Sequence, residues 1–286
     1  MSKQIAVIGS QGQLGWELCR QLGSQAIGLS RAELDITNPA EILRVLTVCR
    51  PTAVVNTAAY TKVDQAETDA AACHLVNATA VGYLAEVCQR LECPLVQVST
   101  DYVFGDAGPR DRPYVETDPA EPRGEYARSK LAGERLAAET PRHFVVRTCG
   151  LYGYRPKPSL SNFVDTMLRL GREREELRVV DDQHCTPSYV AHVALAIEFL
   201  LQTTAYGTYH VVNAGATTWY DFAAEIFRQT GNKIRLQRIS TAQYGAAAPR
   251  PTYSVLDTSK YHALGGPAMP SWQDALAEYL QRAGSR

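Results

Sequence analysis

Short apolar segments rich in β-branched residues alternate along the chain with longer amphipathic segments. Apolar runs without polar alternation are typical of strands in a parallel sheet that is covered on both faces. Strands are expected over residues 5–9, 26–29, 53–59, 94–100, 143–148, 177–180 and 208–212. Helices are expected between them, over residues 13–23, 39–50, 66–91, 125–140 and 188–202. This alternation predicts an α/β fold built on a doubly wound parallel sheet of the Rossmann type.

The organisation changes in the second half of the chain. The segment 150–163, GLYGYRPKPSLSNF, is rich in Pro, Gly and Ser and is expected to leave the sheet. Two further helical patterns, around 219–230 and 271–283, flank the Ala- and Pro-rich stretch YGAAAPRPTYS. We therefore expect a Rossmann domain from 1–149 and 176–212, and a smaller mixed α/β lobe from 150–175 and 213–286. The lobe should lie over the carboxyl ends of the strands, where such sheets bind ligands.

The composition is that of an ordinary globular protein, with 45% apolar and 21% charged residues and a net charge of −1. This balance disfavours a nucleic-acid or membrane-surface binder, since such proteins usually carry a basic excess. No apolar run approaches the roughly 20 residues that span a bilayer, and the start, MSKQIAVIGS, enters a strand without a signal-peptide pattern. The seven cysteines form no CxxC pair, which disfavours a disulfide framework and a structural zinc site. We expect a reduced, cytoplasmic protein without nucleic-acid or membrane partners.

Three glycines, Gly9, Gly12 and Gly15 in IAVIGSQGQLGWEL, follow the first expected strand and open the first helix. Such glycines permit a tight turn and let backbone N–H groups approach a pyrophosphate at the helix N-terminus. A glycine-rich turn without a ligand has the same pattern. Its position at the amino end, inside a βαβ unit, favours a dinucleotide.

The end of the second expected strand bears on which dinucleotide binds. An acidic residue there accepts hydrogen bonds from the ribose 2′-hydroxyl of NAD. This chain has Ser30 and Arg31 in GLSRAELD, and a hydroxyl and a guanidinium suit the 2′-phosphate of NADP. The other reading of Arg31 is a solvated loop charge. We expect NADPH as the cofactor, with NADH as the alternative.

A second pattern, EYARSK, places Tyr126 and Lys130 on one face of a predicted helix. Two exposed side chains would give the same pattern, so it is weak alone. A lysine charge within about 4–6 Å would lower the tyrosine pKa, and the tyrosine would pass a proton to a carbonyl oxygen as hydride reaches the carbon. Ser99 and Thr100 end the fourth strand, where a hydroxyl would either bind the same oxygen or cap the next turn.

Together, the glycine loop, the strand-end Ser/Thr pair and the YxxxK pattern resemble the extended short-chain dehydrogenase/reductases. The closer resemblance is to the dTDP-4-dehydrorhamnose reductase family and covers nearly the whole chain. It is carried, in matching order, by GSQGQLGWEL, VVNTAAYTKVDQAE, STDYVFGD, EYARSKLAGE, NFVDTMLRL, DDQHCTPSYVA, TTWYDFA and RPTYSVLDTSK. The resemblance implies that NADPH or NADH reduces the 4-keto group of a dTDP-linked 6-deoxysugar to give dTDP-L-rhamnose. The Rossmann domain would hold NADP and the smaller lobe the nucleotide sugar.

The resemblance also implies roles for individual residues. Thr100 would bind the carbonyl oxygen, Tyr126 would be the acid, and Lys130 would hold the nicotinamide ribose and lower the Tyr126 pKa. The dinucleotide would contact Gly9, Gln11, Gly12, Gln13, Leu14, Gly15, Ser30, Arg31, Asp35, Ile36, Ala58, Ala59, Tyr60, Thr61, Ser99, Tyr126 and Lys130. The nucleotide sugar would contact Val63, Thr100, Asp101, Tyr102, Gly150, Asn162, Phe163, Trp219 and Arg250. Arg250 would pair with the diphosphate, whereas Phe163 and Trp219 are explained as well by core packing.

Departures from the family pattern change two of these expectations. Gly150 in RTCG stands where relatives commonly have an aromatic residue near the sugar, which leaves the exact sugar open. Some relatives bind magnesium at a dimer interface through acidic residues. Glu17 matches one of these, but Ala191 stands at a second. Because a hard cation needs several oxygen ligands, we expect no metal here, and a monomer or weak homodimer.

Two other functions stay open on the sequence alone. One is a different nucleotide-sugar enzyme on the same scaffold, such as an epimerase or a reductase of another sugar, which Gly150 favours. The other is a non-catalytic, dinucleotide-binding regulatory subunit, like the β subunit of methionine adenosyltransferase. The intact set of Thr100, Tyr126 and Lys130 argues against the regulatory subunit.

Overall fold

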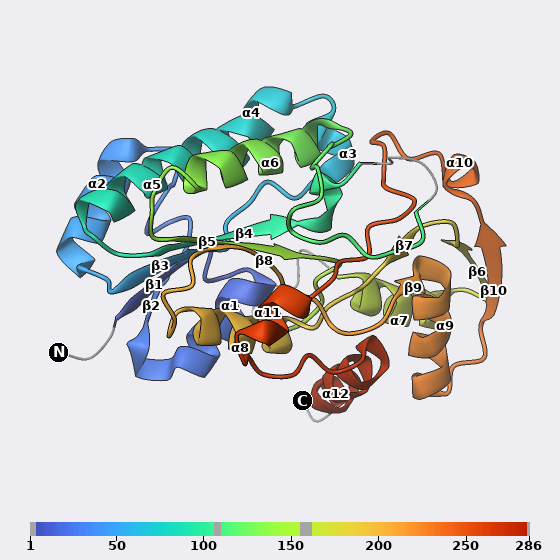
Figure 1. Ribbon diagram of the computed structural model, residues 1–286. Helices are drawn as coiled ribbons and strands as arrows, with labels where there is room; N and C mark the ends of the chain where they lie inside the picture. Colours follow the sequence, from blue (N-terminus) through green and yellow to red (C-terminus); the bar gives the residue numbers. More distant parts are fainter. Residues whose placement is uncertain (1–3, 106–109, 155–161, 285–286) are drawn as a thin grey trace.

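A six-stranded parallel sheet forms the centre of the molecule (Figure 1). The computed structural model describes residues 4–105, 110–154 and 162–284. The strands run in the order β2-β1-β3-β4-β5-β8 and are all parallel. Their bounds are β1 (Ile5–Ile8), β2 (Ala26–Leu29), β3 (Ala53–Asn56), β4 (Leu95–Thr100), β5 (His143–Thr148) and β8 (Gly207–His210). The predicted α/β fold with a doubly wound parallel sheet is confirmed.

Helices cover both faces of this sheet because successive side chains of each strand point to opposite sides. On one face, α1 (Gln13–Leu22) packs against α8 (Val190–Leu200). On the other lie α2 (Pro39–Cys49), α5 (Ala80–Arg90) and α6 (Glu125–Ala137) (Figure 1). Val7 of β1 belongs to the first core and its neighbour Ile8 to the second.

The predicted helix over 66–91 is divided. A short α3 (Val63–Ala66) precedes α4 (Ala70–His74), which continues through η2 (Leu75–Thr79), a π-helical turn, into α5. By length and composition alone, the resulting helix of 21 residues, Ala70–Arg90, would be able to cross a bilayer. Half of its most apolar window is buried inside the protein, where it contacts α2, α6 and β4. Core helices commonly pass the same test, so it is weak evidence for a membrane span.

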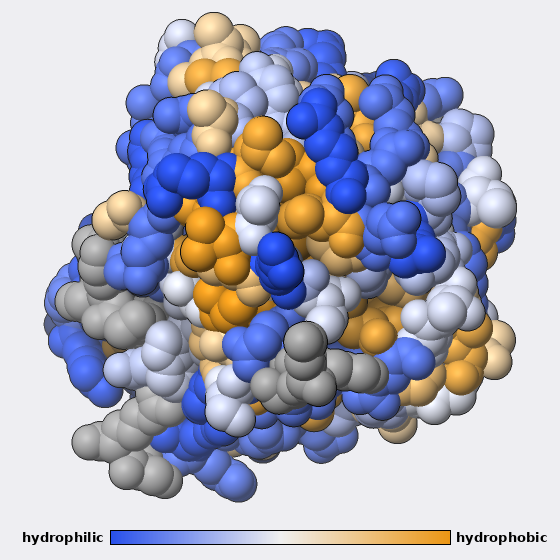
Figure 2. Space-filling view, turned by 90° about the vertical axis from the view of Figure 1, so that its left-hand side faces the viewer, coloured by the Kyte–Doolittle hydropathy of each residue, from blue (hydrophilic) through white to orange (hydrophobic). Residues whose placement is uncertain are grey.

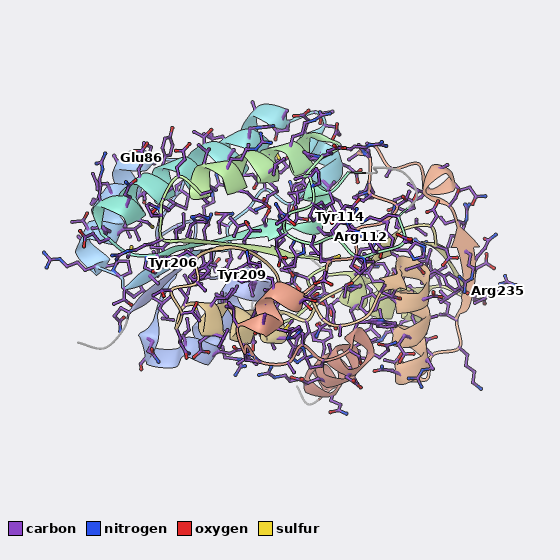
Figure 3. All side chains as sticks on the ribbon, viewed as in Figure 1. Glu86, Arg112, Tyr114, Tyr206, Tyr209 and Arg235 are labelled. Carbon is purple, nitrogen blue, oxygen red and sulfur yellow. The ribbon has the colours of Figure 1, made fainter. Side chains whose placement is uncertain are left out.

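The strand predicted over 177–180 forms, but its expected place in the central sheet is wrong. This strand, β6 (Glu176–Val180), pairs in parallel with β10 (Arg235–Ile239) in a separate two-stranded sheet. The preceding α7 (Phe163–Glu173) packs on α9 (Trp219–Thr230) and carries the chain away from the sheet. An ion pair between Arg235 and Glu176 joins the two strands, and Arg235 lies at the outer edge of the molecule in Figure 3.

The smaller lobe contains several elements that the sequence pattern did not predict. Besides α7 and β10, these are β9 (Thr217–Thr218) and the short helices α10 (Thr241–Tyr244) and α11 (Ser259–Ala263). β9 pairs with β7 (His184–Cys185), which lies outside the residues expected in the lobe. The C-terminal helix is α12 (Trp272–Gly284). Phe222 and Trp272 from this part of the chain share one hydrophobic cluster with Val7 and Val55 of the central sheet. The lobe is therefore anchored on the sheet face that α1 and α8 cover.

Candidate active site

The three glycines after β1 form a compact turn. Gly9 has a φ of +80°, and its carbonyl accepts the Gly12 N–H at 2.9 Å. A Cβ on Gly15 would lie 2.3 Å from the Gly9 oxygen, whereas one on Gly12 would lie 3.3 Å from it. Gly9 thus supplies the backbone conformation and Gly15 the close approach of α1 to the turn.

The N-terminus of α1 is open to an anion. Gly12 occupies the N-cap position and offers no side-chain cap to the helix. The first N–H groups of a helix lack intrahelical partners, and the helix dipole favours negative charge beside them. A pyrophosphate fits this cradle. At the end of β4, the buried Ser99 hydroxyl is without a hydrogen-bond partner among the described residues.

The loop after β3 is held by a residue that the sequence reasoning missed. Asn77, in the π-helical turn, accepts the Tyr60 N–H at 2.9 Å and donates to the Tyr60 carbonyl at 3.1 Å. It also donates to the Ser129 hydroxyl of α6 at 3.0 Å. Asn77 therefore fixes the loop Ala58–Ala59–Tyr60–Thr61, expected to contact the dinucleotide, against the helix that carries Tyr126. The available signal was an asparagine beside the apolar residues Leu75, Val76 and Ala78 of a predicted helix.

A second missed residue, Glu67, supports the start of α6. Gly124 precedes the helix with a φ of +81° and provides no side-chain cap. The Glu67 carboxylate instead accepts the Glu125 N–H at 2.8 Å. This contact satisfies one N-terminal donor and places a negative charge where the helix dipole favours it. The helix is thereby fixed one residue before Tyr126.

Tyr126 and Thr100 come together as expected. A hydrogen bond between their hydroxyls favours the phenolate, but burial is the larger effect and raises the pKa of Tyr126. The Thr100 hydroxyl also donates to Asp101 Oδ1 at 3.1 Å and accepts the Tyr102 N–H at 3.2 Å. The Tyr102 ring meets the Tyr126 ring edge-on, with centroids 6.0 Å apart. Tyr126 thus stays protonated at neutral pH, as an acid requires.

The sequence predicted that Lys130 lowers the pKa of Tyr126, but the pKa of Tyr126 is raised. Lys130 is buried, and its Nζ donates to the Val98 carbonyl at 2.7 Å. Burial lowers the pKa of Lys130 to about 8, while the Glu134 carboxylate opposes that shift. The prediction of a lowered Tyr126 pKa was wrong because desolvation of the phenol outweighs the favourable contacts.

Beneath Lys130 lies a buried layer of charge. Glu134, one turn further along α6, pairs with Arg147 of β5 through bonds of 2.7–3.2 Å. Arg147 also approaches His210 Nε2 at 3.4 Å. His210 Nδ1 contacts the Tyr114 carbonyl at 3.0 Å, and Figure 3 shows Tyr114 near the middle of the molecule. Burial, then the Arg147 charge, lower the pKa of His210 to about 3, so this imidazole is neutral.

Asp101, expected to face the sugar, is 2% exposed. Its Oδ2 accepts the Ser254 hydroxyl at 2.6 Å, and burial raises its pKa. Asp101 therefore ties the Thr100 end of β4 to the segment of the smaller lobe that holds Ser254. Tyr102 and Val63, also expected at the sugar, are partly buried, and Val63 begins α3.

Arg250, the expected partner of a diphosphate, is engaged by a carboxylate. Its two terminal nitrogens donate to Asp64 at 2.8 and 3.0 Å. Asp64 also accepts the Ala248 N–H at 3.0 Å, and these bonds, that of Arg250 first, lower its pKa. Burial raises the pKa of Tyr102, and the Arg250 charge opposes that shift. The guanidinium thus acts on Tyr102, which follows β4, from the smaller lobe.

The space beside Gly150 holds an aromatic ring. Gly150 has a φ of +50°, and a Cβ there would lie 3.0 Å from Trp219 Cη2. Trp219 packs on Phe163 with centroids 4.8 Å apart, and Phe163 stacks on Phe222. Asn162 caps α7 and donates to Gln13 Oε1 at 3.1 Å. Gly150, Asn162, Phe163 and Trp219 were expected at the nucleotide sugar, and they lie in one packed group that reaches Gln13 at the start of α1.

The residues expected at the adenosine end gather after β2. Ser30 is buried, and its N–H donates to Glu33 Oε2 at 2.7 Å. The Arg31 side chain is 87% exposed. Asp35 accepts the Thr37 N–H and hydroxyl, and Ile36 is buried in the core under α2. Glu33 was not among the expected residues.

Glu17, the match to a magnesium ligand of some relatives, is buried and paired with cations. Its carboxylate accepts bonds from Arg20 at 2.5–3.2 Å and from Gln21 at 2.8 Å. Gln21 also donates to the Ala191 carbonyl at 3.0 Å. In the described ranges no three His, Cys, Asp or Glu side chains form a group suited to a metal. The expectation of no metal stays a prediction.

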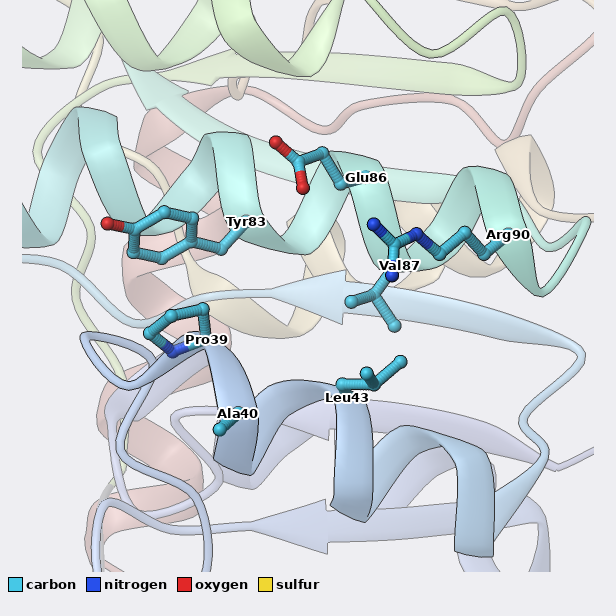
Figure 4. A pocket seen from close by; sticks show the side chains of 7 residues that line it. All are labelled: Pro39, Ala40, Leu43, Tyr83, Glu86, Val87 and Arg90. Atoms are coloured by element: carbon cyan, nitrogen blue, oxygen red, sulfur yellow. The ribbon is translucent and has the colours of Figure 1, made fainter.

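A surface groove lies apart from these residues. It has a volume of about 220 Å³ and lies between the exposed sides of α2 and α5. Val87 points towards Leu43 across it, with Glu86 and Arg90 along α5 (Figure 4). It belongs to the end of the molecule seen in Figure 2, where apolar side chains gather between charged ones and α2 exposes Leu43 and Val48. No residue expected to bind the dinucleotide or the sugar lines it.

Comparisons with known proteins place the chain in a family. Residues 3–285 match the family described as the RmlD substrate binding domain. The chain is 38% identical to the spore coat polysaccharide biosynthesis protein SpsK of Bacillus subtilis, covering 99% of this chain and 98% of that protein. It is 38% identical to a dTDP-4-dehydrorhamnose reductase of Burkholderia thailandensis, over 96% of each. A crystal structure of the Bacillus anthracis dTDP-4-dehydrorhamnose reductase in complex with NADP matches with a TM-score of 0.93 at 38% identity, over 99% of this chain and 100% of that one. The chain therefore belongs to the dTDP-4-dehydrorhamnose reductase family, as its motifs predicted.

Proposed function

We propose that the protein reduces the 4-keto group of dTDP-4-dehydro-L-rhamnose to dTDP-L-rhamnose, with NADPH as the reductant. The observation that carries this proposal is the Thr100–Tyr126 hydroxyl pair, set beside buried Lys130 in a chain of this family. The open N-terminus of α1 and the close-packed glycines support a dinucleotide at the same edge of the sheet.

The chain's own residues would bind and protonate the substrate. Bound NADPH supplies a hydride to the carbonyl carbon. Thr100 holds the carbonyl oxygen by a hydrogen bond, and Tyr126 donates its phenolic proton to that oxygen as the alkoxide forms. The high pKa of Tyr126 keeps the proton in place beforehand. Lys130 follows Tyr126 by one turn of α6, and its charge would offset the negative charge left on the phenolate.

The sugar assignment rests on the family. Gly150 lacks the aromatic side chain of relatives, and the ring tip of Trp219 lies beside it. Arg250 is the candidate for the diphosphate and would exchange Asp64 for the ligand. The division into a Rossmann domain and a nucleotide-sugar lobe also stays a proposal, with β6 and β10 assigned to the lobe. Cytoplasmic location and a monomer or weak homodimer stay predictions.

The direct test incubates the purified protein with NADPH and dTDP-4-dehydro-L-rhamnose and follows nicotinamide absorbance. Wild type should oxidise NADPH in proportion to dTDP-L-rhamnose formed. Tyr126→Phe should lower kcat by roughly 10²–10⁴-fold, the usual contribution of a general acid. Tyr83→Phe, on α5 away from the site, is the matched control and should keep full activity. Absence of oxidation by wild type would reject the proposed reaction.

A further inference from the structure

Lys130 lies where an ammonium group is costly. Its side chain is buried, and its Nζ donates to one uncharged acceptor, the Val98 carbonyl, at 2.7 Å. An ammonium has three N–H donors, and removing it from water favours the uncharged amine. Burial accordingly lowers the pKa of Lys130 to about 8. Because the proposed mechanism uses the charged form, an opposite charge nearby would support it.

Glu134 supplies such a charge from the same helix. It follows Lys130 by four residues, and residues at this spacing lie on one face of a helix. The Glu134 side chain is buried as well. After burial, its carboxylate is the largest influence on the pKa of Lys130, which it raises. Since both groups are almost out of water, the attraction between their charges is screened much less than at the surface.

Arg147 holds the Glu134 carboxylate in place. Its guanidinium, on β5, donates from Nε at 3.0 and 3.2 Å and from Nη2 at 2.7 Å. Paired contacts of this kind fix the orientation of a carboxylate as well as its position. Arg147 Nη1 also meets the ring of His210, which is neutral, at 3.4 Å. Glu134 therefore cannot turn away from α6 without losing its bonds to Arg147.

The other ionisable groups on elements packed against α6 do not supply this charge. They are Cys73 of α4, Tyr126 of α6 itself, Asp101 of η3 (Asp101–Val103) and Arg147 of β5. Burial raises the pKa values of Cys73 and Tyr126, so both are protonated at neutral pH. Among the described residues, only Glu134 and Cys73 act electrostatically on Lys130. In that part of the chain, Glu134 is thus the negative charge that favours the ammonium.

We propose that Glu134 is a positioning residue for the reaction, which acts by keeping Lys130 in its ammonium form. The ammonium then offsets the charge that Tyr126 acquires when it gives up its proton. Arg147 contributes by holding Glu134 and does not itself contact the reacting atoms. This inference rests on the proposed function, because the benefit of the charge arises at proton transfer.

The charge of Lys130 can be followed without any sugar. The chain contains six lysines, so lysine labelled with carbon-13 at Cε gives a simple NMR spectrum of the full-length protein. The resonance that is missing from Lys130→Met belongs to Lys130, and its shift against pH gives the titration midpoint. Wild type should titrate near pH 8. Glu134→Gln should lower the midpoint by about one pH unit, because the buried charge that favours the ammonium is gone.

Further variants separate the charge of Glu134 from its shape. Glutamine keeps the shape and an oxygen for Arg147 but has no charge. Glu134→Asp keeps the charge on a shorter side chain, so its midpoint should stay within about half a unit of wild type even where stability is lost. Glu134→Gln combined with Arg147→Gln should also have a lowered midpoint, which keeps the test decisive where a lone Arg147 charge unfolds the protein. Glu139→Gln removes an exposed carboxylate just beyond α6 and should leave the midpoint unchanged.

The reaction should follow these midpoints. For Glu134→Gln, kcat/KM should match wild type at pH 6 and be roughly fivefold lower at pH 8, through kcat and with KM for the sugar unchanged. Equal NMR midpoints in wild type and Glu134→Gln would overturn the inference, as would a shift in Glu134→Asp as large as that in Glu134→Gln. A lowered midpoint in Glu134→Gln, together with a wild type that does not reduce the sugar, would support the effect of Glu134 on Lys130 and reject the proposed function alone.

Discussion

The two ends of the proposed dinucleotide site are built in different ways. At the catalytic end, Lys130, Thr100 and Asp101 are buried, and each makes hydrogen bonds within the protein. At the adenosine end, Arg31 is almost fully exposed and the exposed Glu33 accepts the Ser30 N–H. Proton transfer requires atoms fixed to within tenths of an ångström, and burial provides this. The exposed charges at the adenosine end are held less tightly.

The largest expected effect tests the burial of the catalytic end. Arg147→Met leaves Glu134 without its partner below Lys130, and should lower the free energy of unfolding by about 3–5 kcal/mol. Arg112→Met is the matched control, because Arg112 pairs with Asp118 at the surface and should cost less than about 1 kcal/mol. Denaturant titration measures both. Equal losses in the two variants would show that the buried layer has no special role.

The glycine turn between the two ends gives the next effect. Gly15→Ala forces a methyl group against the Gly9 carbonyl and should cost about 1–3 kcal/mol of stability. The Cβ of Gly12→Ala would lie 3.3 Å from the same oxygen, so this variant should lose less than about 1 kcal/mol of stability. Thermal unfolding of both variants ranks the two costs. The reverse order would contradict the close approach assigned to Gly15.

Lys130 should make the catalytic end sensitive to pH. Its pKa of about 8 means that the ammonium is present below pH 8 and lost above it. Because catalysis uses this charge, kcat/KM should fall up to tenfold per pH unit as the pH rises above about 8. In Lys130→Arg the residual activity should lack this decline, because a guanidinium stays charged. A wild-type rate that is flat through pH 9 would contradict the role given to the ammonium.

The smallest expected effect concerns Asp64, whose side chain is half exposed. Asp64→Asn should change the free energy of unfolding by about 1 kcal/mol, since the amide oxygen still accepts a hydrogen bond from Arg250 and the carboxylate it replaces is half exposed. It should lower KM for the nucleotide sugar, because Arg250 no longer has to leave a carboxylate. Glu173→Gln removes the exposed pair with Arg169 on α7 and is the control. An unchanged KM in Asp64→Asn would show that Arg250 does not bind the diphosphate.

The regular part of the fold followed from the sequence because buried parallel strands are continuous apolar runs. The run at 177–180 is apolar except for Arg178 and was expected in the same sheet, yet β6 pairs with β10. Nothing in these four residues indicates which strand will pair with them, because the path of the chain through α7 decides it. The short β7 and β9 lack any periodic signal for the same reason, since each has two residues.

The candidate site was predictable where one motif holds the chemistry, as with Gly9, Gly15 and the Tyr126–Lys130 pair. It was not predictable where distant segments meet. Asn77 acts through Tyr60, which is 17 residues away. Glu33 was not expected because only the turn after β2 brings its carboxylate back to the Ser30 N–H. The direction of the Tyr126 pKa also required the structure, because spacing along a helix gives no measure of burial.

The central claim is that this site delivers hydride to the sugar carbonyl while Tyr126 protonates the oxygen. It is tested most directly by supplying NADPH deuterated at the transferred C4 position together with dTDP-4-dehydro-L-rhamnose, and analysing the sugar by mass spectrometry and NMR. The account predicts dTDP-L-rhamnose carrying one deuterium at C4 with wild type, and almost none in the same time with Tyr126→Phe. A sugar altered in configuration but without deuterium would contradict the account and favour an epimerase.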